Sequence, residues 1–163
     1  DFSGLIEPFM KVWQAGVAAS GIPPQVMSPM NRWIAEQSGS AGEYLQAVSQ
    51  MQMIARRIVG FFEAYDVLVL PTYMYPTIRI GEWADLSPEE TLQKIITWIA
   101  PCPPFNASGL PAIALPTGFD SSTGLPIGVQ LVGRPAAEAT LITLAAQLEA
   151  AKPWSQHRPT IAL

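Results

Sequence analysis

Cysteine and histidine are almost absent from this 163-residue chain, which contains one of each, Cys102 and His157. A single cysteine cannot form an internal disulfide, and a structural zinc site needs about four cysteine or histidine ligands. His157 lies in a proline-bounded tail, where we expect an exposed side chain without a catalytic role. We therefore expect no disulfide, no metal site and a protein that works in the reducing cytoplasm.

Charge is also scarce, and its net sign does not suit nucleic acid. Charged residues make up 13% of the sequence, and nine Lys and Arg against thirteen Asp and Glu leave a net charge of -4. Neutralising phosphates requires an excess of positive charge, so we exclude nucleic acid as a partner. The low charge content indicates that some of the apolar surface faces more protein.

Long apolar runs are missing, because Gly, Pro, Gln or a charged residue interrupts every stretch well before the ~20 residues of a membrane-spanning helix. Hydrophobic residues still make up 49% of the chain, enough for a packed core. We expect a soluble protein that forms a single unit over residues 1–163 and has no membrane partner. The chain begins at Asp1 rather than at an initiator methionine, which suggests a piece of a longer protein.

Motifs for cofactor binding or catalysis are lacking as well. Neither a P-loop nor a G-x-G-x-x-G motif occurs, so we expect no cofactor. Residues 38–42 (SGSAG) imitate a nucleophile elbow, but Ser40 is better explained as a helix cap. Glu89 and Glu90 suit the first turn of a helix, and Cys102 has no basic neighbour that would activate its thiol. Composition and spacing alone identify no catalytic residue.

The apolar spacing predicts helices that alternate with a strand and a hairpin. Residues 1–39 read as a helical lead-in, and residues 40–163 as a helix-strand-helix-hairpin-helix core. Helices are predicted over residues 5–19, 40–65, 87–99 and 136–152, with a short helix after Ser28. A strand is predicted over residues 67–70, covered on both faces. Residues 112–115 and 126–133 are predicted to form a hairpin. Ser40 and Ser87 each begin a capping box with a glutamate three residues later. The proline-rich residues 101–106 are expected to be extended or turning. The fold class is α/β, a mixed β-sheet with packed helices.

Four blocks of the sequence resemble the C-terminal part of amidase signature family enzymes. These blocks are residues 64–72 (AYDVLVLPT), 104–113 (PFNASGLPAI), 124–135 (GLPIGVQLVGRP) and 138–141 (EATL). Their order and spacing agree with the family pattern over most of the chain. The resemblance implies a hydrolase of carboxamide C–N bonds, built as an α/β/α layered domain, of which this chain is a partial fold.

The family resemblance also implies where the chemistry lies. Family members use a serine, a second serine in a cis peptide and a lysine, which belong to the N-terminal part together with the oxyanion-hole amides. Nothing in this chain matches those segments, so no catalytic residue is carried over. We expect the chain alone to be inactive, and its partners to be the missing N-terminal part of the same enzyme and a small-molecule amide.

The resemblance implies that this chain forms one wall of the substrate pocket. In α/β folds, ligands bind at the loops that follow strand ends, so the candidates are sought there. The candidate substrate-binding residues are Thr72 and Tyr73 after the first strand, and Trp98, Ile99, Cys102 and Asn106 before the hairpin. For several of these residues, a purely structural role is the alternative to contact with the substrate. Trp98 and Ile99 continue an apolar helix stripe, and Asn106 can hydrogen-bond the backbone of a proline-rich turn.

The sequence allows more than one substrate class and more than one mode of assembly. Family members that use glutamine to amidate charged tRNA have an acidic residue shortly before the Pro-x-Asn segment, whereas here residues 98–101 read WIAP. Because a buried ammonium without a carboxylate partner is costly, we expect an apolar or aryl amide rather than glutamine. The alternatives are a piece of a glutamine-dependent amidotransferase, a non-catalytic module for small-molecule binding or assembly, and a dedicated subunit that joins a separate N-terminal chain. Exposed apolar faces would also allow a homo-oligomer.

Overall fold

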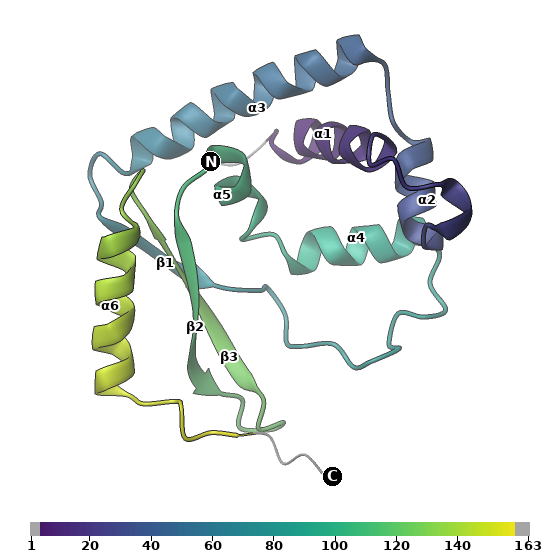
Figure 1. The fold of residues 1–163 in the computed structure, drawn as a ribbon. Coiled ribbons are helices and arrows are strands. Elements are labelled where there is room, and N and C mark those ends of the chain that lie inside the picture. The colour runs from purple at the N-terminus through teal and green to yellow at the C-terminus, as the bar shows by residue number, and fades with distance from the viewer. Residues whose placement is uncertain (1–3, 159–163) are drawn as a thin grey trace.

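The computed structural model describes residues 4–158, so the ends of the predicted unit, residues 1–3 and 159–163, lie outside the described part (Figure 1). The elements in chain order are α1 (Ile6–Ala18), a 3-10 turn η1 (Pro24–Val26), α2 (Pro29–Glu36), α3 (Ala41–Phe61), β1 (Val67–Pro71), α4 (Pro88–Trp98), α5 (Pro103–Ser108), β2 (Ala112–Phe119), β3 (Pro126–Gly133) and α6 (Glu138–Ala151). Nearly every predicted element is therefore present, and the α/β class is confirmed.

The helix starts follow directly from the sequence. The Ser40 hydroxyl accepts from the Glu43 backbone N–H at 3.3 Å, and the Glu43 carboxylate accepts from the Ser40 N–H at 2.7 Å. Ser87 and Glu90 make the same reciprocal pair at 3.3 and 2.9 Å. Both predicted capping boxes are confirmed. Ser40 is therefore a helix cap rather than a nucleophile, and the Glu90 carboxylate is hydrogen-bonded at the start of its own helix.

The three strands form one antiparallel sheet in the order β1-β3-β2. Val67 of β1 lies opposite Gly133, and Ala112 of β2 lies opposite Val132, so β3 is the central strand. The predicted hairpin is β2 and β3, with a bulge between Pro116 and Gly118. The central position of β3 brings the end of β1 next to the turn that joins β2 to β3.

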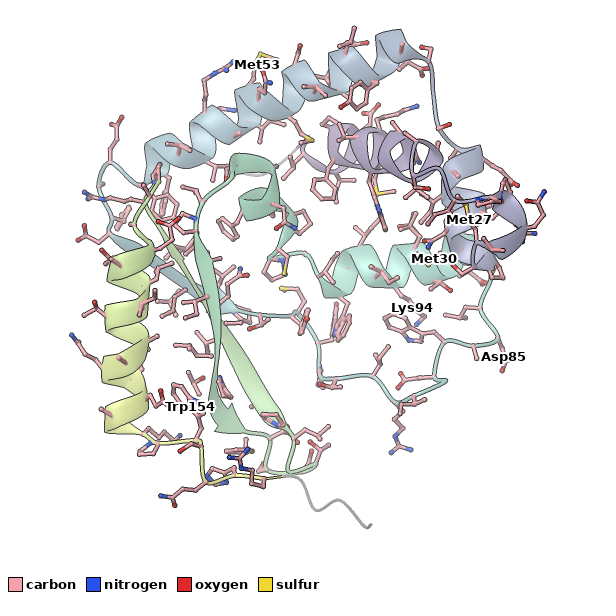
Figure 2. The ribbon with its side chains drawn as sticks, in the orientation of Figure 1. Met27, Met30, Met53, Asp85, Lys94 and Trp154 are labelled. Carbon is pink, nitrogen blue, oxygen red and sulfur yellow. The ribbon has the colours of Figure 1, made fainter. Side chains whose placement is uncertain are left out.

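Two apolar clusters lie on opposite faces of the sheet. Val132 belongs to a cluster with residues of α3 and α5, whereas its neighbour Leu131 belongs to a cluster with α6. Successive side chains of a strand point to opposite faces, which explains the division. Figure 1 shows α6 beside the sheet on one side and α1, α2 and α4 gathered on the other. Trp154, after the end of α6, packs against the second cluster (Figure 2). No helix within residues 4–158 is long and apolar enough to cross a bilayer.

Two local predictions were wrong. The strand of residues 67–70 was expected to be covered on both faces, but in the described part of the chain the Val69 side chain is 60% exposed. Residues 101–106 were expected to be extended or turning, but α5 begins at Pro103. Prolines are tolerated in the first turn of a helix, where the missing N–H would have no partner anyway, and Gly109 at φ 67° ends the helix.

Candidate functional site

A hollow of about 240 Å³ lies where β1 ends, between the segment that follows β1 and the turn of the β2–β3 hairpin. Thr72 and Tyr73 line it from one side, and Asp120, Thr123 and Gly128 from the other. The antiparallel pairing builds this hollow, because it places the end of β1 opposite the start of β3. The Thr72 backbone N–H donates to the Gly128 carbonyl at 3.1 Å and fixes the approach of the two segments.

A second hollow, of about 570 Å³, adjoins the first one and opens over the outer face of α4. Residues 75–77 line both hollows, and we call the two adjoining hollows together the trough. Trp83 and Glu82 line the second hollow from the loop before α4, and Lys94 and Trp98 line it from the helix. Lys94 extends from α4 toward the loop that carries Asp85 (Figure 2).

Aromatic rings form the wall between the hollows. The rings of Tyr73 and Trp98 are stacked with centroids 4.4 Å apart and an interplanar angle of 13°, and Trp83 meets Trp98 edge-on at 6.0 Å. The ammonium of Lys94 lies 5.9 Å from the Trp83 ring, which is within the range of a cation–π contact. The Trp98 indole N–H donates to the Tyr75 carbonyl at 2.9 Å, and the Trp98 carbonyl accepts from the Met74 N–H at 2.9 Å. These bonds hold the loop after β1 against the end of α4.

Cys102 has a structural position beneath this wall. Its Sγ lies 3.6 Å from the Thr72 carbonyl, to which the thiol donates, and burial raises the thiol pKa. The buried Gln130 side chain donates to the neighbouring Pro101 carbonyl at 3.4 Å. A thiol with a raised pKa is protonated at neutral pH and is a poor nucleophile. Cys102 therefore helps to position the segment before α5 against β1 and β3.

The structure brings together four of the six predicted wall residues: Thr72, Tyr73, Trp98 and Cys102. Ile99 is half-buried at the end of α4, where its N–H donates to the Ile95 carbonyl at 2.9 Å. Asn106 lies exposed within α5 and lines neither hollow. The expected proline-rich turn that Asn106 would stabilise is a helix, because its backbone N–H donates to the Cys102 carbonyl at 3.2 Å.

The lining residues that the sequence reasoning missed include Trp83, Lys94 and Asp120. Trp83 lies in a loop without apolar periodicity, and Lys94 lies on the polar face of a helix. No local sequence pattern therefore marks either residue as part of a site. Asp120 lies in the predicted hairpin turn, and only strand pairing brings that turn to the end of β1. Within residues 4–158, no cluster of three or more His, Cys, Asp or Glu side chains could hold a metal ion.

Asp120 is held in its ionised form by the hairpin turn. Its Oδ1 accepts from the backbone N–H groups of Ser122 and Thr123 at 3.0 and 2.8 Å, and from their hydroxyls at 2.5 and 2.9 Å. Hydrogen bonds to the charged form lower a carboxyl pKa. The hydroxyls of Ser122 and Thr123, followed by the Thr123 N–H, lower the pKa of Asp120 to about 2. The first hollow therefore keeps a carboxylate at its rim across the physiological pH range.

We expect the double variant Ser122→Ala, Thr123→Ala to raise the Asp120 pKa from about 2 toward its ordinary value. Because the folded pKa is depressed, the stability that this group contributes is present above its unfolded pKa and is lost as the pH falls toward 2. The titration of the Asp120 carboxyl carbon by NMR checks the result. An unchanged midpoint in the double variant would show that the hydroxyls do not stabilise the carboxylate.

The remaining candidate groups do not form a catalytic constellation in the described part of the chain. His157 is exposed and its ring lies 4.4 Å from that of Phe119. The hydroxyls of Ser40 and Ser87 both serve their helix caps. The arrangement therefore offers a shaped, aromatic wall with an anionic rim at Asp120 and a cation at Lys94, rather than a nucleophile with its base.

Solved structures of larger enzymes share this fold. The structure of 6-aminohexanoate cyclic dimer hydrolase superposes with a TM-score of 0.79 and 29% sequence identity, covering 93% of this chain and 36% of that chain. A bacterial aryl acylamidase of the amidase signature family has a TM-score of 0.65 at 23% identity, covering 95% of this chain and 36% of that chain, and shows the same fold. The described chain therefore has the fold of a part of these larger enzymes.

Sequence comparison identifies the family. The Amidase family profile matches residues 12–142, and the chain belongs to the amidase family. A putative amidase of Synechocystis sp. is 54% identical over 158 residues, which is 97% of this chain and 31% of that protein. A glutamyl-tRNA(Gln) amidotransferase subunit from Moorella thermoacetica is 40% identical over 118 residues, which is 72% of this chain and 23% of that protein. The chain spans less than a third of the length of these relatives and corresponds to their C-terminal part.

Proposed function

We propose that this chain forms the C-terminal scaffold and one wall of the substrate pocket of an amidase, an enzyme that hydrolyses carboxamide C–N bonds. The observation that carries the proposal is the Tyr73–Trp98 stack, which lies at the carboxyl end of β1 between two adjoining hollows. Membership of the amidase family gives the reaction class. The wall shapes and orients a substrate, while the attacking group comes from outside this chain.

The reaction needs an activated serine, which the proposal assigns to the N-terminal part of the same enzyme. The resemblance to the amidase signature family implies a serine, a cis-peptide serine and a lysine there. This chain would then have no hydrolytic activity by itself, and its partner would be that N-terminal part. The expected location is the cytoplasm. Relatives about three times as long as this chain support such a division.

The proposed substrate is an amide with an apolar or aryl group. Aromatic rings bind such groups through stacking and edge contacts, and Tyr73, Trp83 and Trp98 provide three ring surfaces in one trough. Thr72, Tyr73 and Trp98 would contact the substrate, and Ile99, Cys102 and Asn106 would support the segment behind the wall. The structural neighbour that is an aryl acylamidase supports this substrate class.

Glutamine-dependent amidotransfer is the second candidate, and the Moorella relative favours it. Asp120 supplies a carboxylate at the rim of the first hollow, which could bind the ammonium of glutamine. The two candidates differ in one measurable ratio. If the full-length protein hydrolyses acyl anilides faster than glutamine, the apolar substrate class stands, and the reverse order would establish the amidotransferase alternative.

Replacing Trp98 by leucine in the full-length protein tests the pocket wall. We expect kcat/KM for an acyl anilide to fall about tenfold, because the loss of an aromatic contact costs about 1.4 kcal/mol of binding. The change should appear mainly in KM, since Trp98 would bind the substrate without taking part in chemistry. Trp13→Leu in α1, which lines neither hollow, is the matched control. Equal kcat/KM values for Trp98→Leu and the unmodified protein would refute the assignment of the wall.

A further inference from the structure

The second hollow of the trough has the size and the lining of a small-molecule site. Its volume of about 570 Å³ lies within the range of about 300–1,000 Å³ that is typical of such sites. Small-molecule sites combine apolar and aromatic walls with a few polar groups that orient the ligand. Here the rings belong to Tyr75, Trp83 and Trp98, and the polar groups include Gln93 and Lys94. The proposed aryl substrate accounts for the rings but not for the cation.

Both walls of this hollow are held by hydrogen bonds. One wall is a single face of α4, where helical spacing aligns the lining residues Gln93, Lys94, Thr97 and Trp98. The other wall is the loop before α4, which the Trp98 indole N–H ties to the helix through the Tyr75 carbonyl at 2.9 Å. Within the loop, the Arg79 N–H donates to Glu82 Oε2 at 2.8 Å. A ligand therefore meets a hollow that is already formed, which lowers the cost of binding.

The Lys94 ammonium has no carboxylate partner within residues 4–158, although three acidic residues lie near it. Glu90 is four residues earlier on the same helix, but its Oε2 accepts from the Ser87 hydroxyl at 2.7 Å and from the Ser87 N–H at 2.9 Å. These two bonds dominate the lowering of the Glu90 pKa, to which the charge of Lys94 contributes least. Glu82 lines the same hollow, and Asp85 lies on the loop that Lys94 faces (Figure 2), but neither forms an ion pair with Lys94.

Lys94 and Trp83 together match an aromatic acid. The ammonium lies 5.9 Å from the centroid of the Trp83 ring, so a cation lies beside an aromatic surface. An aryl ring packs on tryptophan through offset or edge contacts, and a carboxylate accepts charge-assisted hydrogen bonds from an ammonium. Because both contacts belong to one ligand, the loss of translational freedom on binding is incurred only once.

We propose that the second hollow binds an aryl group that carries a carboxylate, with the ring against Trp83 and Trp98 and the carboxylate at the Lys94 ammonium. The inference rests on the proposed function and narrows its substrate class from aryl amides to acidic aryl amides. The carboxylate of Asp120 repels an anion from the first hollow, so the acidic end of the substrate has one orientation along the trough. Lys94 determines specificity and takes no part in the chemistry.

Two ligands without an amide test the site independently of hydrolysis. They are para-toluate and para-methylbenzyl alcohol, which share a ring and differ in a carboxylate against a neutral hydroxymethyl group. In the full-length protein, we expect para-toluate to bind at least about tenfold more tightly. Fluorine NMR of fluorotryptophan-labelled protein measures the binding, and the signals of Trp83 and Trp98 should shift while that of Trp154 stays. Equal Kd values for the two ligands, or no shift at Trp83 and Trp98, would overturn the inference.

Charge variants identify the group that binds the carboxylate. Lys94→Met should weaken para-toluate about tenfold and leave the alcohol within about twofold, whereas Lys94→Arg should retain the preference for the acid. Arg57→Met removes the same charge from an exposed position of α3 that lines neither hollow, and should change neither Kd. Glu82→Gln removes a negative charge from the hollow and keeps an acceptor for the Arg79 N–H, so para-toluate should bind about twofold more tightly. Equal losses in Lys94→Met and Arg57→Met would contradict the assignment.

Hydrolysis of a matched pair of amides separates this inference from the proposed function. We expect kcat/KM of the full-length protein for para-acetamidobenzoate to exceed that for para-methylacetanilide about tenfold, and Lys94→Met to remove the difference through KM. If both amides are hydrolysed with equal kcat/KM, the proposed function stands and the inference is overturned. If neither is hydrolysed but para-toluate still binds in a Lys94-dependent way, the proposed function fails while the carboxylate site stands.

Discussion

Replacing Leu131 by alanine lowers the free energy of unfolding by about 2–5 kcal/mol, which is the usual cost of truncating a buried leucine. Leu131 lies on the central strand and is 1% exposed. Its side chain packs with Leu115, Leu141 and Ala145 between the sheet and α6. The substitution removes apolar contacts and leaves a cavity that the surrounding strand and helix cannot close fully. Denaturant titration of the full-length protein measures the change.

The control for this prediction lies on the same strand. Ile127 is 48% exposed, so Ile127→Ala should change the free energy of unfolding by no more than about 0.5 kcal/mol. Both residues are aliphatic and lie on β3, so the difference between their effects on the free energy of unfolding measures the packing of α6 on the sheet. It does not measure strand propensity. A cost for Leu131→Ala as small as that of Ile127→Ala would show that this cluster is not a core.

Replacing Gly128 by alanine is expected to destabilise the protein by about 1–3 kcal/mol, because the new methyl group overpacks the contact between β3 and the end of β1. A Cβ at this position would lie 2.7 Å from Thr72 Oγ1 and 3.2 Å from Thr72 Cβ. Rotation about χ1 of Thr72 moves Oγ1 but leaves the tight contact with Cβ, so the two segments must also separate by a few tenths of an ångström. The first hollow, which both residues line, should widen as the segments separate.

Two variants test the cause of this effect. Gly118→Ala is the matched control, since a Cβ on that strand glycine meets no atom within 4 Å. Thr72→Ala removes the nearest atom and should recover at least about 0.5 kcal/mol in the double variant with Gly128→Ala. Thr72 Oγ1 is buried without a hydrogen-bond partner in the described part of the chain, so its removal leaves no broken bond. Strict additivity of the two substitutions would contradict the steric account.

Local chemistry explains which parts of the fold could be predicted. Ser40 and Ser87 signal their helices because each capping box is complete within four residues of sequence. The β2–β3 hairpin was likewise predictable from turn formers between two apolar strands. Helix α5 was missed because its closely spaced prolines suggest a turn, and the tolerance of proline in a first helical turn depends on where the helix begins.

The candidate site was predictable where it follows β1 or precedes the hairpin. Thr72 and Tyr73 were expected at the wall because strand ends are common ligand positions, and Trp98 was expected from the family resemblance. Trp83 and Asp120 reach the trough through loop geometry and strand pairing, neither of which leaves a local pattern. Asn106 was placed at the wall because it precedes the hairpin, whereas it lies exposed within α5 and lines neither hollow.

The division of labour within the amidase is tested most directly by comparing the 163-residue chain with the full-length protein in one assay. A fluorophosphonate probe reports the reactive serine, acyl anilide hydrolysis reports turnover, and a cooperative thermal transition shows that the chain is folded. The account predicts labelling and hydrolysis by the full-length protein, and neither by the folded chain. Labelling of the chain alone, together with turnover of an amide, would contradict the account.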